Sequence, residues 1–88
     1  MFKSDINYPK VSVIVPFYNN SETIDETLRS VEAQTYPSVE IIVVDDGSNE
    51  YNNNKLKQIL SNRPHIQFIE QSNKGPASAR NTGAHQAS

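Results

Sequence analysis

The stretch Glu40-Ile41-Ile42-Val43-Val44-Asp45-Asp46-Gly47-Ser48 carries the strongest structural signal in the chain. Four apolar β-branched residues follow one another without a polar interruption, which is typical of a strand covered on both faces in a parallel sheet. We predict a strand over residues 40–44, ended by an Asp-Gly-Ser turn because Gly accepts positive φ and Asp and Ser hydrogen-bond within turns. Asp45 and Asp46 then stand at the carboxyl end of a buried strand, where ligands bind in open α/β sheets.

The preceding segments predict a strand and a helix. The strand covers residues 11–15, and Pro16 should end it because proline has no N–H for a central ladder. Asn20 or Ser21 can cap the following helix, which has an apolar residue at every third or fourth position. Tyr36-Pro37 should mark its exit, since the residue before proline avoids the α region. Strand, helix and strand in this order predict a parallel pair.

The segments after the turn repeat this alternation. We expect a polar loop over residues 49–54, a short helix over residues 55–61 and a more exposed strand over residues 65–70, at a sheet edge. Pro76 suits the first position of a last helix, in which Gly83 should cost about 1 kcal/mol relative to Ala. The predicted fold is α/β, with three layers and a mostly parallel sheet in β-α-β-α-β-α order.

Length and composition exclude several classes. The chain has 88 residues, a net charge of -2 and no cysteine, so it holds at most one domain, no disulfide framework and no thiolate metal site. The near-neutral charge argues against a nucleic-acid partner. Neither a signal-peptide core nor a run of 18 apolar residues is present. We therefore expect a cytoplasmic protein with a flexible lead-in at residues 1–10.

Common catalytic motifs are also absent from the sequence. Gly47, Gly75 and Gly83 form neither a dinucleotide-binding fingerprint nor a P-loop. His65 and His85 lie far apart without a helical partner, which argues against a histidine metal site. No G-x-S-x-G elbow for a serine nucleophile occurs.

Three loops should meet at one edge of the sheet, because each follows a predicted parallel strand. They are residues 16–20, 45–48 and 73–81. A nucleobase needs a ring to stack on and a partner for its edge, and a carboxylate accepts from the imide N–H of uracil. A diphosphate needs cations and the amides of a helix N-terminus. The loops offer an aromatic ring, carboxylates, amides and cations: Tyr18, Asp45, Asp46, Asn19, Asn73, Asn81, Lys74 and Arg80.

Each of these residues has a plainer interpretation. Tyr18 could be a half-buried aromatic residue, and Asp46 could support the turn or cap a helix. Lys74 could be a solvated charge, and Arg80 a structural ion-pair partner. Their convergence at three successive strand ends favours a nucleoside-diphosphate ligand.

Four linked motifs closely resemble the start of family 2 glycosyltransferases, across nearly all of residues 10–88. The resemblance implies the GT-A fold, a Rossmann-like nucleotide-sugar domain of which residues 11–88 are the N-terminal, nucleotide-binding half. It implies a hexosyl transfer with inversion from a nucleotide sugar, expected to be a UDP-sugar, in polysaccharide biosynthesis. The motifs are residues 11–19 (VSVIVPFYN), 30–35 (SVEAQT), 40–48 (EIIVVDDGS) and 73–83 (NKGPASARNTG).

The resemblance also assigns roles by position. Tyr18 is similar to the residue that stacks on the base, with Pro16 beside it. Asp46 is similar to the carboxylate that binds the uracil imide, with Asp45 as its neighbour in the motif. Arg80 resembles the arginine that reaches the base or the diphosphate, and its loop includes Asn73.

Other parts of the family's site have no counterpart in these motifs. The resemblance implies a divalent metal, Mg or Mn, held by an Asp-x-Asp on a later strand, and a general base that follows it. We therefore assign no catalytic and no metal-binding residue, and we expect the 88-residue chain to be inactive alone. The acceptor should be a saccharide or a lipid-linked acceptor, handled in the cytoplasm or at the cytoplasmic face of a membrane.

Two other functions stay open. The chain could be a binding or assembly module that pairs with another copy through an open sheet edge. A nucleotidyltransferase is the third alternative, but its glycine-rich loop after the first strand is missing.

Overall fold

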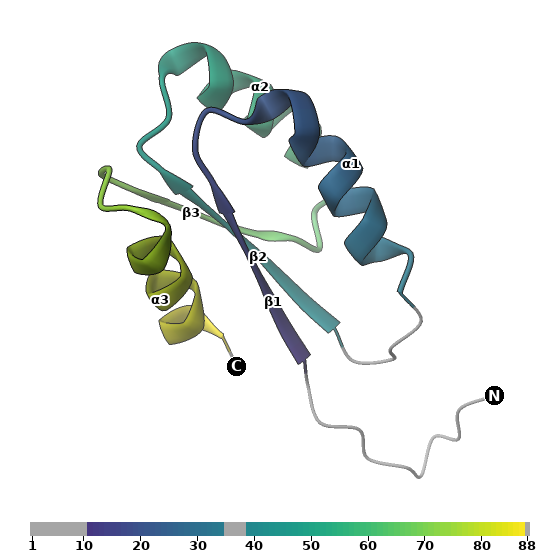
Figure 1. Cartoon of the computed structure of the whole chain (residues 1–88). Coiled ribbons are helices and arrows are strands. Elements are labelled where there is room, and N and C mark those ends of the chain that lie inside the picture. The colour runs from purple at the N-terminus through teal and green to yellow at the C-terminus, as the bar shows by residue number, and fades with distance from the viewer. Residues whose placement is uncertain (1–10, 35–38, 88) are drawn as a thin grey trace, which may run out of the picture.

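Three parallel strands alternate with three helices in a computed structural model that describes residues 11–34 and 39–87 (Figure 1). β2 lies between β1 and β3, and both pairs are parallel. The predicted α/β order is therefore confirmed. No helix within the described ranges has the length and apolar character needed to cross a membrane. The elements are β1 (Val11–Phe17), α1 (Ser21–Glu32), β2 (Val39–Asp46), α2 (Glu50–Leu60), β3 (Gln67–Gln71) and α3 (Pro76–Gln86).

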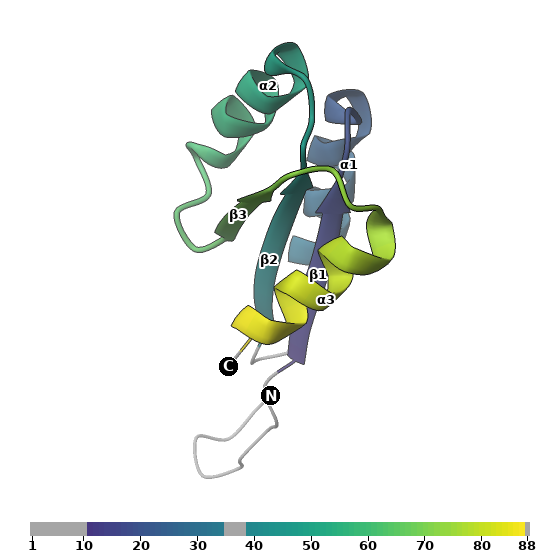
Figure 2. The same cartoon turned by 90° about the vertical axis from the view of Figure 1, so that its left-hand side faces the viewer.

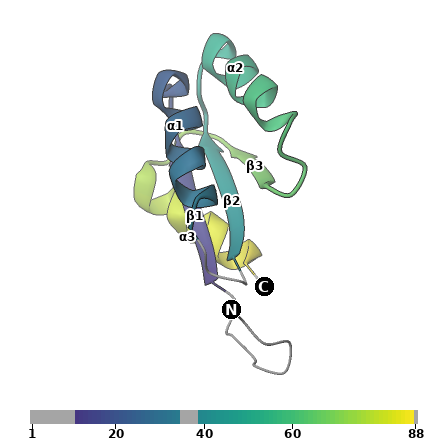
Figure 3. The same cartoon turned by 90° about the vertical axis from the view of Figure 1, so that its right-hand side faces the viewer.

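β2 forms the centre of a three-layer sandwich. Its residues from Ile41 to Asp46 are all buried, because helices cover both faces of the sheet. Ile41 and Val43 join the larger core with α1 and α2, whereas Ile42 and Val44 face α3 in a smaller core. Figure 2 shows α3 in front of β1, and Figure 3, from the opposite side, shows α1 there. The alternation of side chains along β2 therefore assigns successive residues to different layers.

Close approach of α3 to the sheet depends on Gly83. A Cβ at this position would lie 2.4 Å from Cγ2 of Ile14 and 3.3 Å from Cγ2 of Val44. Ala79, one turn earlier, is also buried against the same strands. Gly83 lowers the intrinsic propensity of the helix, as expected, but the structure adds that this position has no room for a side chain.

Several predicted boundaries differ from the structure. Pro16 does not end β1, which continues to Phe17. Proline is tolerated there because β1 is an edge strand within the described sheet. The prediction of a loop at residues 49–54 is wrong, since α2 begins at Glu50 with Asn49 as its N-cap. The predicted exit at Tyr36-Pro37 lies outside the described residues.

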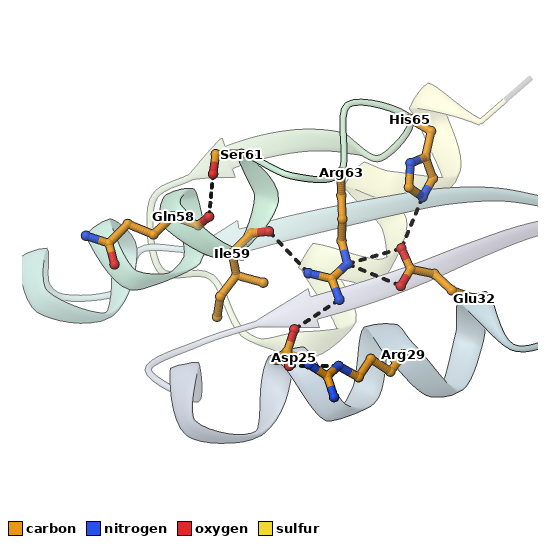
Figure 4. A network of polar contacts seen from close by, with 8 residues as sticks. All are labelled: Asp25, Arg29, Glu32, Gln58, Ile59, Ser61, Arg63 and His65. Carbon is orange, nitrogen blue, oxygen red and sulfur yellow. Dashed lines mark hydrogen bonds and ion pairs between the residues drawn. The ribbon is translucent and has the colours of Figure 1, made fainter.

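An ion-pair network fastens α1 to the connection between α2 and β3 (Figure 4). Arg63 donates from Nε to Glu32, from one terminal nitrogen to Asp25 and from the other to the carbonyl of Ile59, over 3.0–3.2 Å. Desolvation by burial works against the charged form of Arg63, but the hydrogen bonds to Glu32 and Asp25 outweigh it and raise the pKa. His65 also contacts Glu32, at 3.1 Å. This network lies on the helical layer away from α3.

Candidate nucleotide-binding site

A cleft of about 390 Å³ opens at the carboxyl ends of the strands, where the three loops meet. This volume falls within the usual size range of small-molecule sites, about 300–1,000 Å³. Four of the residues predicted from the sequence line it, together with four that were not predicted. The lining residues are Pro16, Tyr18, Asp46 and Asn73, and in addition Phe17, Asn20, Gly75 and Pro76.

Asp46 is the carboxylate of this cleft, and it closes the loop that leads into α3. Its Oδ1 accepts from Nε2 of Gln71 and from the backbone N–H of Lys74, both at 2.8 Å. Its Oδ2 accepts from the N–H of Gly75, also at 2.8 Å. The hydrogen bond from Gln71 is the largest influence on this carboxyl, and together with the two amides and the Lys74 charge it outweighs desolvation and lowers the pKa. Asp46 is therefore held as an anion although only 4% of it is exposed.

Asp45 lies on the opposite face of the sheet from Asp46. Consecutive residues of a strand point to opposite faces, and both acids belong to β2. Asp45 accepts from the N–H of Ser48 at 3.0 Å and from Nδ2 of Asn53 in α2 at 2.5 Å. These contacts fix the turn between β2 and α2. The structure does not bring Asp45 into the cleft.

Tyr18 and Asn73 frame the cleft from two different loops. Tyr18 is 50% exposed, so its ring is accessible to a ligand. The loop that contains Asn73 approaches Gly47 so closely that a Cβ there would lie 2.7 Å from the Asn73 nitrogen. Arg80 is exposed on α3 and does not line the cleft. Arg80 also forms no ion pair with another residue within 11–34 and 39–87, so its plainer interpretation as an ion-pair partner is not supported either.

Asparagine side chains hold the first two loops together. The N–H of Asn19 donates to Oγ of Ser48 at 2.9 Å, and the N–H of Asn49 donates to Oδ1 of Asn19 at 2.8 Å. Asn19 has a φ of 50°, a left-handed conformation that asparagine tolerates better than most residues. Asn20 accepts from the N–H of Tyr18 at 2.8 Å and so fixes the backbone that carries the aromatic ring. The sequence signal for this network was the density of asparagine beside the predicted strand ends.

The described residues do not provide a metal site. No three His, Asp or Glu side chains gather among them in a way that could hold an ion. The two acids of β2 point away from each other, and both already accept hydrogen bonds from protein donors. The donor set at this edge of the sheet therefore fits an N–H-bearing ligand better than a cation.

The chain is similar in sequence to two longer bacterial proteins, a glycosyltransferase and a polysaccharide synthase. The glycosyltransferase GlyA of Streptococcus pneumoniae is 42% identical over 74 residues, which are 84% of this chain and 11% of that protein. Poly-beta-1,6-N-acetyl-D-glucosamine synthase of Staphylococcus aureus is 38% identical over an alignment of 89 positions, covering 98% of this chain and 22% of that protein. The chain thus spans a small part of these relatives.

A solved structure with the same fold is the mannosyltransferase PcManGT from Pyrobaculum calidifontis, in complex with GDP-Man and Mn²⁺. It superposes with a TM-score of 0.81 at 31% identity, over 93% of this chain and 25% of that one. The arrangement of three parallel strands and three helices is therefore the Rossmann-like start of a GT-A fold.

The family model of glycosyl transferase family 2 matches residues 12–88, which is nearly the whole sequence. The chain belongs to glycosyltransferase family 2.

Proposed function

We propose that this chain binds the nucleotide of a sugar donor, with UDP as the preferred nucleotide, for an inverting hexosyl transfer to a saccharide or lipid-linked acceptor. The observation that carries the proposal is the pairing of an accessible ring, Tyr18, with a buried carboxylate, Asp46, in one cleft. The ring supplies a surface on which a base can stack, and the carboxylate supplies an acceptor for the edge of that base.

The hydrogen bonds of Asp46 favour uracil among the bases. An ionised carboxylate has about four acceptor positions. Gln71, Lys74 and Gly75 fill three of these, so one position is left, on Oδ2. Uracil presents a single N–H on its pairing edge, whereas guanine presents two donor groups and cytosine has an acceptor in the place of the imide. One open acceptor position therefore matches uracil.

The diphosphate is expected near the start of α3, but with fewer amides than the sequence suggested. The N–H groups of Lys74 and Gly75 donate to Asp46, and Pro76 has none. The side chain of Lys74 and the exposed Arg80 remain as the cationic groups of this region, and we propose that they reach the diphosphate. Asp45, on the far face, would then act on the nucleotide only through the turn that it stabilises.

Sugar transfer by the 88-residue chain alone is not expected. Asp46 is the one carboxylate that lines the cleft in the described part of the chain, and its hydrogen bonds leave it poorly suited to act as a base. The solved mannosyltransferase holds Mn²⁺, and we propose that the present protein also uses a divalent metal, with ligands other than the described residues. Release of sugar from a UDP-sugar by the purified chain would contradict this proposal.

Isothermal titration of the chain with UDP, CDP and GDP tests the proposed nucleotide. All three share the diphosphate, so differences between them report on the base. We expect UDP to bind more tightly than CDP by roughly tenfold, because cytosine presents a lone pair to the anionic Asp46 where uracil presents a donor. Equal affinities for the three nucleotides would remove Asp46 as the reader of the base.

Self-association through the sheet edge is a second candidate, since β1 and β3 are both edge strands of the described sheet. Val11, at the start of β1, is 38% exposed although its side chain is apolar. Sedimentation velocity over a range of concentrations distinguishes the two: a monomer throughout argues against edge pairing and leaves nucleotide binding intact.

A further inference from the structure

A chain of hydrogen bonds leads from α3 through β3 to Asp46. The hydroxyl of Thr82 donates to Oε1 of Gln71 at 2.5 Å, and Nε2 of Gln71 donates to Oδ1 of Asp46 at 2.8 Å. The three residues belong to three different elements that are separated in sequence by up to 36 positions, from Asp46 to Thr82. Thr82 and Gln71 are partly buried and do not line the cleft.

The direction of each hydrogen bond in this chain is fixed by chemistry. An ionised carboxylate only accepts, so the amide nitrogen of Gln71 must face Asp46. The amide oxygen of Gln71 must then face Thr82, whose hydroxyl has to be the donor. Asp46 thereby fixes the orientation of the Gln71 amide, and Thr82 stabilises that orientation by donating to the amide oxygen.

The contacts of Asp46 show what this support achieves. Oδ1 accepts hydrogen bonds from the side-chain amide of Gln71 and the backbone N–H of Lys74, whereas Oδ2 accepts one only from the backbone N–H of Gly75. Without Gln71, the carboxylate could turn to share its oxygens differently between the two loop amides. The position left open on Oδ2 depends on Oδ1 being occupied.

We propose that Thr82 and Gln71 are positioning residues that hold Asp46 with one Oδ2 acceptor position open toward the cleft, and so set the preference for a base with a single imide donor. The inference rests on the proposed function in so far as the base is concerned. It extends that function to two residues outside the cleft, one of which acts only through the other.

Thr82→Val tests the proposal because valine keeps the shape of threonine and removes the donor. We expect the variant to bind UDP roughly threefold to tenfold more weakly, as for the loss of one hydrogen bond. Thr82→Ser keeps the hydroxyl and should restore the affinity. Thr27→Val, the same change at an exposed position of α1, should bind UDP as the unchanged protein does.

A second readout does not require a nucleotide. The carboxyl carbon of Asp46 can be followed by NMR as pH is lowered, and its pKa should rise in Thr82→Val because the support from Gln71 is weakened. Lys74 is the charged group that acts on Asp46 among the described residues, and it is unchanged in the variants. Gln71→Met, which removes both hydrogen bonds of the amide, should raise the pKa further.

The outcomes separate this inference from the proposed function. An Asp46 pKa that stays low in both Thr82→Val and Gln71→Met overturns the positioning role, regardless of the affinity of these variants for UDP. If the wild-type chain does not bind UDP, the proposed function is wrong. The titration of the Asp46 carboxyl still tests the positioning role in that case. If Thr82→Val does not fold, Gln71→Met supplies the same test from β3.

Discussion

Gly83→Ala should destabilise the fold, although it replaces glycine by the best helix former. The new Cβ would lie 2.4 Å from Cγ2 and 3.1 Å from Cδ1 of Ile14. Cγ2 is bonded directly to the β-carbon of Ile14, and a β-branched side chain has little freedom to rotate it away. The contact is therefore relieved only if α3 moves away from the sheet.

The size of the effect follows from two opposing contributions. Inserting a methyl group into a packed core costs about 1–3 kcal/mol, and a contact as short as this one belongs in the upper half of that range. Replacing Gly by Ala inside a helix returns about 1 kcal/mol. The expected net loss is about 1–2 kcal/mol in the free energy of unfolding, which lowers Tm by roughly 5–15 °C in a domain of this size.

Urea and thermal denaturation followed by circular dichroism measure this loss. Ile14→Ala removes the obstructing methyl groups, so on that background Gly83→Ala should become neutral or stabilising. Ala84→Gly, at an exposed position of the same helix, is the matched control and should cost about 1 kcal/mol through propensity alone. A Gly83→Ala protein at least as stable as the unchanged chain would refute the close packing of α3 on β1.

Three further predictions concern the loops, the ion-pair network and pH. Gly75 has φ 96° and ψ 161°, so Gly75→Ala should lower the free energy of unfolding by about 1–3 kcal/mol through backbone strain alone. Gly47→Ala should cost more in urea denaturation, because its new Cβ would also lie 2.7 Å from the backbone nitrogen of Asn73. Arg63→Lys loses the planar fork and should cost about 1 kcal/mol, against less than about 0.5 kcal/mol for the exposed Arg29→Lys. The folded pKa of Asp46 is lowered, so its contribution to stability is complete above the ordinary aspartate pKa of about 3.9 and is lost as pH falls through the folded value. Asp46→Asn should flatten the acid limb of a plot of stability against pH, and an unchanged limb would contradict the assigned contacts.

The sheet was predictable because its signals are local. The uninterrupted apolar run of β2 identifies a strand buried on both faces, and the alternation of strands and helices predicts the parallel order. The opposite orientation of Asp45 and Asp46 was also within reach, since consecutive residues of a strand point to opposite faces. A strand predicted to end at Val44 stops two residues too early and so does not include Asp45 and Asp46.

The start of α2 was less accessible to sequence reasoning. Asparagine has low helix propensity because its side chain competes for backbone hydrogen bonds, so residues 49–54 resemble a loop. In the structure these side chains have tertiary partners: Asn52 accepts from Ser21 at 2.6 Å, and Asn53 donates to Asp45. Ser21 is 31 positions from Asn52 and Asp45 is 8 positions from Asn53, so both partners lie outside the helix, and they outweigh the local preference. The available hint was Asn49, a good N-cap, followed by Glu50 in the first turn.

The site was predictable in its parts but not in its internal contacts. The loops that line the cleft follow strand ends, which the sequence locates well. That Asp46 uses its oxygens to close the Lys74–Gly75 loop depends on the depth at which α3 packs, and this depth is set by Gly83 against the sheet. The hydrogen bond from Thr82 of α3 to Gln71 of β3 likewise depends on tertiary packing and has no local sequence signal. The division of residues into 1–10 and 11–88, and the cytoplasmic location, stay predictions.

Titration of UDP into three forms of the chain tests the central claim most directly. Tyr18 is 50% exposed in the cleft, and Tyr51 is 65% exposed on α2 and outside it, so neither ring is needed for the core. Loss of a stacking ring costs about 1–3 kcal/mol per base, which corresponds to roughly a fivefold to 150-fold weaker Kd. We predict this loss for Tyr18→Ala and none for Tyr51→Ala. Equal affinity of the Tyr18→Ala and unchanged chains for UDP, or no binding by either, would contradict the account.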